Sequence, residues 1–337
     1  MRLARMLGQP VGATIQSFAE WILKIGDGAF AEYQDGESLI DIPYEIITPM
    51  TSEPVEYIIQ AIYPNFLTQS DPINYLYSRA ILAPTIDEVD KVNDYMLSHI
   101  DSELKTYLSS DSASSSDSDS NDFLHEIHST VFLNNIKCSG LLSDELKLKV
   151  GVPVMLMRNI NHSSRLCNGT WLQVTKLGDH IIEALMMHGE NAGEKFLILR
   201  LTLTPSDISL PFTFQHRQFP LMVSYAMTIN KKHGQSLENV GIFLRQPVFT
   251  HGQFFVTASR VTSPSGLKFV ICVEEGKPMK SALNLIYKEV YPPIVPPDRC
   301  WGTSRMACYP FFTKKFILIY SSLALHTCIL IATYIAS

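Results

Sequence analysis

The sequence predicts an α/β fold, a parallel sheet with flanking helices, that contains a small β-rich insertion. Three observations predict it. Residues 80–96 read as a buried strand, a turn and a capped helix, which is typical of α/β proteins. Four short β-like runs separated by turn residues follow between residues 150 and 203, and buried strands resume after residue 219. Neither flanking piece has enough strands for a sheet of its own, so the β-rich block is interpreted as an insertion within one α/β domain.

Composition sets the class of protein. The chain has 337 residues, of which 46% are hydrophobic and 18% charged, enough for one large or two ordinary domains and too apolar for disorder throughout. The net charge of -6 excludes a bulk basic field, so any contact with a polyanion must be local. Six cysteines without a C-x-x-C pair fit neither a disulfide framework nor a zinc ribbon and indicate a reducing compartment. Residues 1–7 lack the apolar core of a secretory signal, so secretion is not expected.

The first predicted element is an amphipathic helix. Phe18, Trp21, Ile22 and Ile25 recur at helical spacing, and the pattern ends at Gly26, which tolerates the conformation of a helix end. This helix is expected to face the core.

The second unit begins with an apolar strand at residues 80–83, which Pro84 ends. Thr85 and Glu88, three residues apart, form the pattern of a capping box. The helix that follows should bury the face made by Val89, Val92 and Met96.

Residues 109–122 are nearly all Ser and Asp and therefore lack apolar surface. The segment 109–127 is predicted to be a disordered loop. Its aspartates account for part of the acidic charge. The β-like runs then lie at residues 150–157, 171–176, 180–186 and 196–203, with turns that include Asn168 and Gly169. These short strands are interpreted as a small β-barrel or sandwich.

Further buried strands are predicted at residues 221–227, 240–244 and 268–273. The tail differs in kind, because prolines interrupt it from residue 292 and residues 316–336 are almost uncharged. That apolar stretch is long enough to span a bilayer, and Lys314 and Lys315 precede it. A membrane anchor that leaves the bulk of the chain in the cytosol is one interpretation, and a tail unrelated to the rest of the fold is the other.

Three segments carry the chemistry. Residues 226–237 form a strand that runs into a polar loop with paired lysines and a glycine, which suits a phosphate or a nucleic-acid backbone. Residues 251–263 form a predicted helix that ends in the lone Arg260. Residues 151–159 and 166–170 form the third segment.

At these residues the sequence resembles the PIF-type (petite integration frequency) DNA helicases of superfamily one, group B, especially their plant Helitron-like branch, from about Met1 to Tyr291. Residues 226–231 resemble helicase motif V, Ser259 and Arg260 resemble motif VI, and residues 81–96 resemble the strand and helix of the second RecA-like lobe. Together, in this order, the motifs are specific for the family.

The resemblance implies a second RecA-like helicase lobe with an inserted small SH3-like β-barrel. Residues 1–108 are assigned to the first part of the lobe and 109–127 to the disordered loop. Residues 128–215 are assigned to the inserted barrel (2B-like), 216–291 to the remainder of the lobe, and 292–337 to the linker and apolar tail.

The resemblance also implies roles for individual residues. Arg260 would reach the γ-phosphate of ATP and stabilise charge during phosphoryl transfer. The other ATP-binding candidates are Gly234, Gln235 and Arg2. The DNA-binding candidates are Thr228, Asn230, Lys231 and Arg158. Two ordinary structural interpretations stand beside these: an arginine at a helix end can bind the terminal carbonyls, and paired lysines can simply be solvated.

The sequence departs from the family in three places. Lys231-Lys232-His233-Gly234 stands where the family usually has Lys-Ser-Gln-Gly, which puts the coupling between DNA and nucleotide in doubt, and Ile86 stands where it usually has Asn. No G-x-x-x-x-G-K-[ST] motif occurs, and no acidic Mg²⁺-binding strand precedes the lobe. The chain therefore looks like the C-terminal half of a helicase. ATP and Mg²⁺ are implied as cofactors by the resemblance, and the chain alone is not expected to hydrolyse ATP.

By resemblance the whole enzyme would be a 5′ to 3′ ATP-dependent DNA helicase in DNA repair, recombination and telomere maintenance, in the nucleus or alternatively the mitochondrion. Its expected partners are single-stranded or forked DNA and a first-lobe polypeptide, with a membrane through residues 316–336 as a further candidate. The alternative is a degenerate, non-enzymatic module that binds nucleic acid or protein. No metal site is predicted, because His233 and His251 have no cysteine or carboxylate at ligand spacing.

Overall fold

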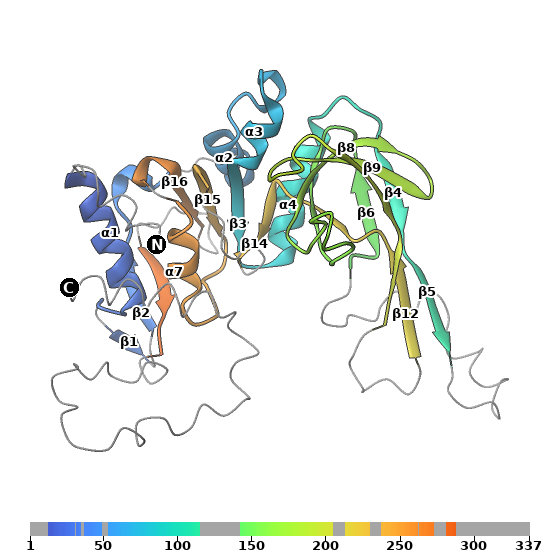
Figure 1. Cartoon of the computed structure of the whole chain (residues 1–337). Helices are drawn as coiled ribbons and strands as arrows, with labels where there is room; N and C mark the ends of the chain where they lie inside the picture. Colours follow the sequence, from blue (N-terminus) through green and yellow to red (C-terminus); the bar gives the residue numbers. More distant parts are fainter. Residues whose placement is uncertain are drawn as a thin grey trace, which may run out of the picture. The chain divides into compact units, whose positions relative to one another are not determined.

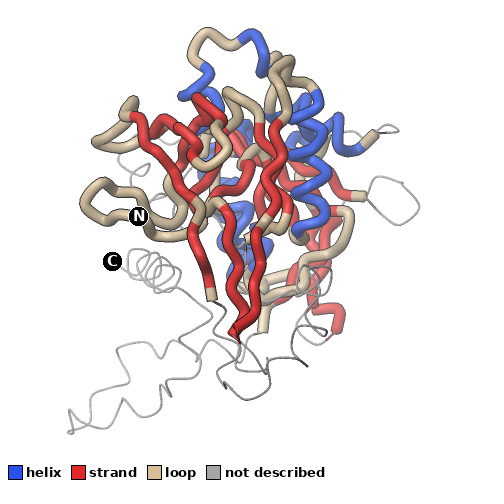
Figure 2. Tube along the Cα trace, turned by 90° about the vertical axis from the view of Figure 1, so that its right-hand side faces the viewer, coloured by secondary structure: helices blue, strands red, loops and turns tan. Residues whose placement is uncertain are grey.

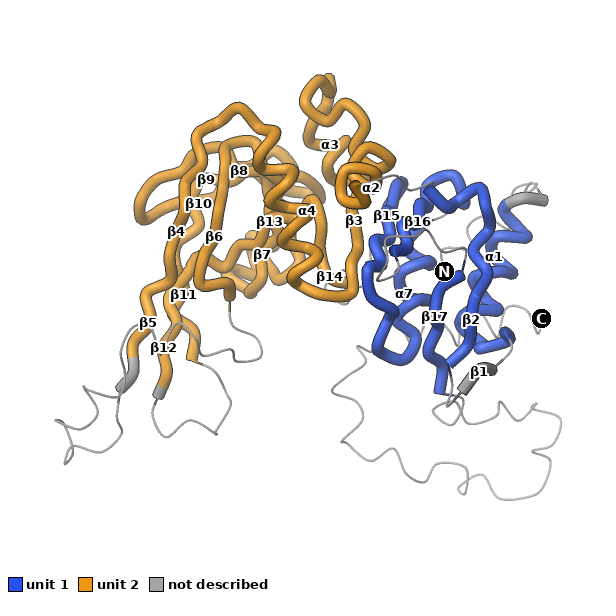
Figure 3. The backbone as a smooth tube through the Cα atoms, turned by 180° about the vertical axis from the view of Figure 1, so that it is seen from behind, with its two compact units in different colours: residues 1–50, 233–337 blue, residues 51–232 orange. Residues whose placement is uncertain are grey.

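The computed structural model describes residues 13–30, 32–34, 37–48, 53–114, 142–204, 213–229, 237–261, 263–272 and 281–287. The chain divides into two compact units, unit 1 (residues 1–50 and 233–337) and unit 2 (residues 51–232), shown in different colours in Figure 3. None of the described helices is long and apolar enough to cross a membrane, and the segment 316–336 lies outside the described residues.

The described part of unit 1 contains helices and short strands (Figure 1). Its described elements are α1 (Ala13–Gly26), β1 (Glu32–Gln34), β2 (Glu37–Asp41), η1 (Tyr44–Ile46), β15 (Asn239–Leu244), α7 (Gln253–Ala258), η4 (Pro264–Gly266), β16 (Leu267–Ile271) and β17 (Ser281–Leu285). Strands β1, β2 and β17 form an antiparallel sheet, whereas β15 and β16 pair in parallel.

Helix α1 confirms the first predicted element. Phe18, Ile22 and Ile25 are buried, as the spacing indicated. Gly26 is required at the end of this helix, because a Cβ there would lie 2.8 Å from the ring of Phe255 in α7. The side-chain amide of Asn284 in β17 donates a hydrogen bond to the carbonyl of Ile25 at 3.2 Å, so the C-terminal end of α1 is fixed to the sheet.

The described part of unit 2 contains three α-helices and most of the described strands. Its described elements are α2 (Pro54–Ile62), η2 (Phe66–Thr68), α3 (Pro72–Tyr77), β3 (Arg79–Ala83), α4 (Ile86–Ser98), β4 (Lys105–Leu108), β5 (Ser110–Ser114), β6 (Glu145–Leu148), β7 (Pro153–Leu156), β8 (Trp171–Leu177), β9 (Ile181–Met186), β10 (Lys195–Leu199), β11 (Leu201–Leu203), β12 (Thr213–Gln218), β13 (Leu221–Val223) and β14 (Ala226–Thr228).

Strands β3 and β14 are parallel, and α4 packs against both. This confirms the strand, turn and helix predicted for residues 80–96. One detail of that prediction is wrong: Thr85 is the N-cap residue of α4, but its side chain makes no capping hydrogen bond. Glu88 is buried, with 5% of its surface exposed.

The β-rich block is centred on an antiparallel sheet with the strand order β10-β9-β8-β7-β13. Two smaller antiparallel ladders, β11-β12-β5 and β4-β6, accompany it. Figure 2 shows the strands in red and the helices in blue. Among the described strands, no ladder joins β10 to β13, so the predicted SH3-like closed barrel is not confirmed. The pairing also extends beyond residues 128–215, because β4 precedes that range and β13 follows it.

Consecutive strands in this block pair with different partners. The chain passes from β4, which pairs with β6, directly into β5, which pairs with β12. The prediction of a disordered loop from residue 109 is therefore wrong at its start, since residues 110–114 form a strand. A ladder needs backbone hydrogen bonds rather than apolar side chains, so a Ser/Asp-rich segment can join one. Residues 115–127 of the predicted loop lie outside the described residues.

Candidate functional site

In unit 1 the candidate site is built around the C-terminal end of helix α7. The helix begins after Gly252, whose φ of +69° lies in the left-handed region that glycine tolerates. The side-chain oxygen of Gln253 accepts hydrogen bonds from the backbone N–H groups of Phe249 and Thr250, at 3.1 and 3.3 Å. The predicted helix over residues 251–263 is thus confirmed in position but is shorter, because it ends at Ala258.

Arg260 follows two residues after the helix and is only 6% exposed. Its backbone N–H donates to the carbonyl of Thr257, and its own carbonyl accepts the N–H of Leu237 at 2.9 Å. Leu237 and Val261 also form a parallel bridge. The last residue of the segment 226–237 therefore lies directly beside the predicted catalytic arginine.

The start of α7 is fixed by a residue that sequence reasoning did not assign. The Nδ1 atom of His251 accepts the backbone N–H of Tyr287 at 2.9 Å, and the two rings stack with centroids 5.7 Å apart. The N–H of Gly252 donates to the carbonyl of Leu285. Burial lowers the pKa of His251, which favours the neutral ring that can accept this bond. Nothing in the local sequence indicates the contact, because its partners are far apart in the chain.

In unit 2 the candidate site is the carboxyl end of the parallel pair β3 and β14. Thr228 is the last residue of β14, pairs with Ala83 at the end of β3 and is half-buried. Ligands in open α/β sheets bind beyond the carboxyl ends of the parallel strands. The geometry thus places the first predicted DNA-binding residue where such a sheet can bind a ligand.

Two buried side chains hold the start of β14, and neither was predicted. The Asn93 side chain in α4 donates to the carbonyls of Val223 and Ala226, both at 3.2 Å, and accepts the N–H of Ala226 at 2.9 Å. The Tyr63 hydroxyl donates to the carbonyl of Tyr225 at 2.9 Å, and burial raises the pKa of that hydroxyl well above its ordinary value. Asn93 had a usable signal: it stands on the apolar face of a predicted helix.

Arg158 is the only other predicted site residue in the described part of the chain, and it is not brought together with Thr228. Arg158 is half-buried in the loop after β7, where the neighbouring N–H of Met157 donates to the carbonyl of Pro220. That loop lies at the start of β13, so β13 and β14 separate it from Thr228. The other five candidates lie outside the described residues: Arg2, Asn230, Lys231, Gly234 and Gln235.

Part of the chain matches a known protein family. Residues 131–177 match the family model described as "DNA helicase Pif1, 2B domain". The chain is similar to Pif1 DNA helicases. The curated relatives are each named as ATP-dependent DNA helicases: one from Bdellovibrio bacteriovorus is 28% identical over 138 residues, and one from Homo sapiens is 32% identical over 130 residues. These stretches cover 41% and 38% of this chain.

The same alignments cover 30% of the Bdellovibrio protein and 19% of the human one, so the chain matches less than a third of either relative. A solved structure, that of Pif1 helicase from Candida albicans, superimposes with a TM-score of 0.48 at 21% identity and covers 75% of this chain and 53% of the other.

Proposed function

We propose that this chain supplies the second RecA-like lobe and the inserted 2B-type region of an ATP-dependent DNA helicase. One observation carries the proposal: the hydrogen bond and parallel bridge that hold Leu237 beside Arg260. The polar loop that resembles motif V and the arginine that resembles motif VI would thereby act on one nucleotide. The names of the curated relatives support the same activity.

Arg260 would stabilise the charge that develops on the transferred phosphoryl group. Its guanidinium is planar and permanently charged, which suits a γ-phosphate oxygen pair. Its burial means that the fold, rather than solvent, fixes the position of the side chain. Gly234 and Gln235 would lie near the same nucleotide, with Arg2 as a second cation on the γ-phosphate side.

ATP and Mg²⁺ fit this chain only in part. The buried guanidinium of Arg260 fits the phosphate end of ATP. The phosphate-binding loop and the Mg²⁺ ligands would come from outside these 337 residues, since no G-x-x-x-x-G-K-[ST] motif occurs within them. The chain's own contribution is thus to position and neutralise the γ-phosphate, while Mg²⁺ would neutralise the phosphate oxygens when bound.

Single-stranded DNA would bind at the carboxyl end of β14. The Thr228 hydroxyl, the Asn230 amide and the Lys231 ammonium group are all suitable donors to phosphate oxygens, and such contacts are independent of base sequence. Arg158 would contact DNA elsewhere, from the loop after β7. Forked DNA is the proposed substrate of the assembled enzyme.

The resemblance further suggests 5′ to 3′ movement, roles in DNA repair, recombination and telomere maintenance, and residence in the nucleus or the mitochondrion. The direction is tested with the assembled enzyme on duplexes that carry a single-stranded tail at either the 5′ or the 3′ end. Unwinding of the 5′-tailed duplex alone is expected.

The central experiment measures DNA-stimulated ATP hydrolysis after the full chain is mixed with a separate first-lobe polypeptide that carries a phosphate-binding loop. The mixture should hydrolyse ATP, whereas neither part alone should. Arg260→Ala should reduce the rate by about 10³-fold or more, the size expected for an arginine that stabilises phosphoryl transfer. Arg260→Lys keeps the charge but not the planar fork and should recover only part of the rate.

Arg245→Ala is the matched control, because Arg245 is an exposed arginine of the same unit and should leave the rate unchanged. Thermal unfolding of each variant separates loss of activity from loss of fold. Full activity of folded Arg260→Ala would remove the arginine from the mechanism. A folded mixture that binds DNA but never hydrolyses ATP would favour the alternative, a non-enzymatic nucleic-acid-binding module.

A further inference from the structure

A separate group of side chains lies in unit 2, where the chain passes from the ladder β4-β6 to the ladder β5-β12. Ser109, between β4 and β5, donates its N–H to the carbonyl of Asp144 at 2.7 Å. The side-chain amide of Gln218, at the end of β12, donates to the carbonyl of Tyr107 at 3.0 Å. Backbone and side-chain hydrogen bonds therefore hold together, at this crossing, three segments that are distant in the sequence.

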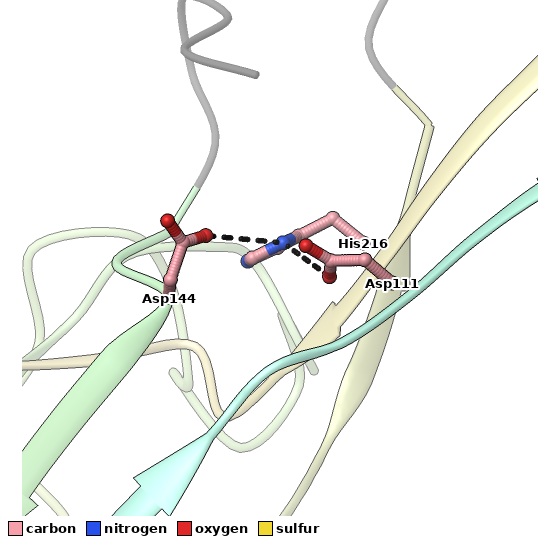
Figure 4. A group of neighbouring side chains, drawn as sticks. All are labelled: Asp111, Asp144 and His216. Carbon is pink, nitrogen blue, oxygen red and sulfur yellow. Dashed lines mark ion pairs between the residues drawn. The ribbon is translucent and has the colours of Figure 1, made fainter. Parts of the chain in front are cut away.

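Three side chains that can bind a metal ion converge at the crossing (Figure 4). Asp111 in β5 and His216 in β12 are direct partners in the strand register, and Asp144 immediately precedes β6. The Nδ1 atom of His216 lies 2.8 Å from a carboxylate oxygen of Asp111 and 3.9 Å from one of Asp144. One ligand atom from each residue lies within 4.8 Å of the others.

The burial of this cluster requires an explanation. The side chains of His216 and Asp111 are 0% and 2% exposed, whereas that of Asp144 is 48% exposed. Among the described residues, neither ring nitrogen of His216 and neither carboxylate oxygen of Asp111 has a hydrogen-bond partner. The 2.8 Å approach of His216 Nδ1 to the Asp111 carboxylate lacks hydrogen-bond geometry. A buried carboxylate in such a setting is costly unless a cation compensates it.

We propose that Asp111, Asp144 and His216 bind a divalent transition-metal ion, with Zn²⁺ the best match. One imidazole nitrogen and two carboxylate oxygens are ligands that Zn²⁺ accepts, and three protein ligands with one open position form a known coordination pattern. The exposed side of Asp144 gives the ion a route to the site and leaves room for a water ligand. Tetrahedral ligands about 2.1 Å from Zn²⁺ are separated by roughly 3.4 Å, so the Asp111 carboxylate must move slightly away from His216 to admit the ion.

The bound ion would act on structure rather than on ATP. It would cross-link β5, β12 and the start of β6, and it would supply the cation that the buried carboxylate of Asp111 requires. The proposal does not depend on the helicase function, because it rests on residues of unit 2 that were assigned no role above.

Equilibrium dialysis of the chelator-treated full chain against Zn²⁺ tests the site directly. The wild-type chain should have one zinc site whose affinity exceeds that of any other zinc site on the chain. Asp144→Asn should weaken this binding at least tenfold without unfolding the chain, because the Asp144 side chain is half exposed. His216→Ala should abolish it. Mg²⁺ should compete poorly, since it prefers oxygen ligands alone.

His162→Ala is the necessary control, because His162 Nδ1 lies 3.5 Å from the sulfur of Cys167 and this exposed pair could take up zinc by itself. That variant should retain the tight site. A folded wild-type chain that takes up no zinc would overturn the proposal. Tight binding that survives in folded Asp144→Asn and is lost in His162→Ala would overturn it as well, since the ion would then sit elsewhere.

Discussion

Two buried polar sites in unit 2 differ in whether their polar atoms have hydrogen-bond partners. Asn93, at the start of β14, makes three hydrogen bonds to backbone groups and is neutral. The side chains of His216 and Asp111, where β5 meets β12, are also buried, but their polar atoms have no hydrogen-bond partner in the described part of the chain. The first site is complete within the chain, whereas the proposed metal ion would complete the second.

The difference teaches where stability should depend on conditions. A fully hydrogen-bonded neutral side chain contributes the same free energy at every pH and metal concentration. A buried site that binds an ion contributes according to how much of that ion is present, so its effect changes with the solution.

The largest effect is expected for Asn93→Ala. The substitution leaves the N–H of Ala226 and two carbonyls buried without their partner, which should lower the free energy of unfolding by roughly 2–4 kcal/mol. Urea denaturation of the full chain measures this. Asn74→Ala, an exposed asparagine in α3, is the control and should change the free energy by less than about 0.5 kcal/mol. Equal effects of the two substitutions would mean that the Asn93 network does not hold β14.

The next effect is the metal dependence of stability at the second site. Zinc at about 100 times its dissociation constant should raise the free energy of unfolding of the wild-type chain by about 2.7 kcal/mol. Asp111→Asn keeps the shape of the side chain but removes the charge, and should lose most of this increase. The same denaturation series with and without zinc measures it. If zinc stabilised Asn93→Ala and Asp111→Asn equally, the two sites would not differ in the way described.

His251 is an intermediate case, half-buried and neutral. The folded chain lowers the pKa of His251, so between that value and about 6.5 the unfolded chain binds the extra proton. Stability should therefore fall as the pH drops below about 6.5 and be fully present above it. His251→Asn keeps an acceptor for the N–H of Tyr287 but does not titrate, so its stability should change less between about pH 7 and pH 5. Parallel slopes for the two proteins would contradict this.

The smallest effect is expected where a charged pair is exposed. Lys105 and Asp179 lie 2.6 Å apart, and the hydrogen bond from Lys105 lowers the pKa of Asp179. Water solvates both groups without help, because their side chains are 33% and 82% exposed. Asp179→Ala should leave the urea midpoint unchanged within error. A shift of the urea midpoint as large as that of Asn93→Ala would show that burial does not decide how much a polar contact contributes to stability.

Much of the fold could be predicted because its elements carry local signals. Strands β3, β15 and β16 are apolar runs, and α1 has the 3.6-residue period that its buried face requires. Strand β5 could not be predicted, since only its backbone hydrogen bonds to β12, about a hundred residues away, make it a strand. For the same reason the turn signals located the β-rich block but not its pairing.

The candidate site divides similarly. The resemblance suggested Arg260 and Thr228 as candidates, yet neither the burial of Arg260 nor its hydrogen bond to Leu237 follows from the sequence. The metal ligands Asp111 and His216 had no recognisable spacing, because the strand register rather than the sequence brings them together.

The most direct test of the proposed function is the binding of single-stranded DNA by the full chain, titrated against salt. The proposal predicts an affinity that falls steeply as salt rises, and a salt slope that Lys231→Ala reduces by about one unit. Lys24→Ala, an exposed lysine of α1, should leave the slope unchanged. Absence of binding at low salt by the folded chain, or binding that is insensitive to both salt and Lys231→Ala, would contradict the proposal that residues 228–231 contact the DNA backbone.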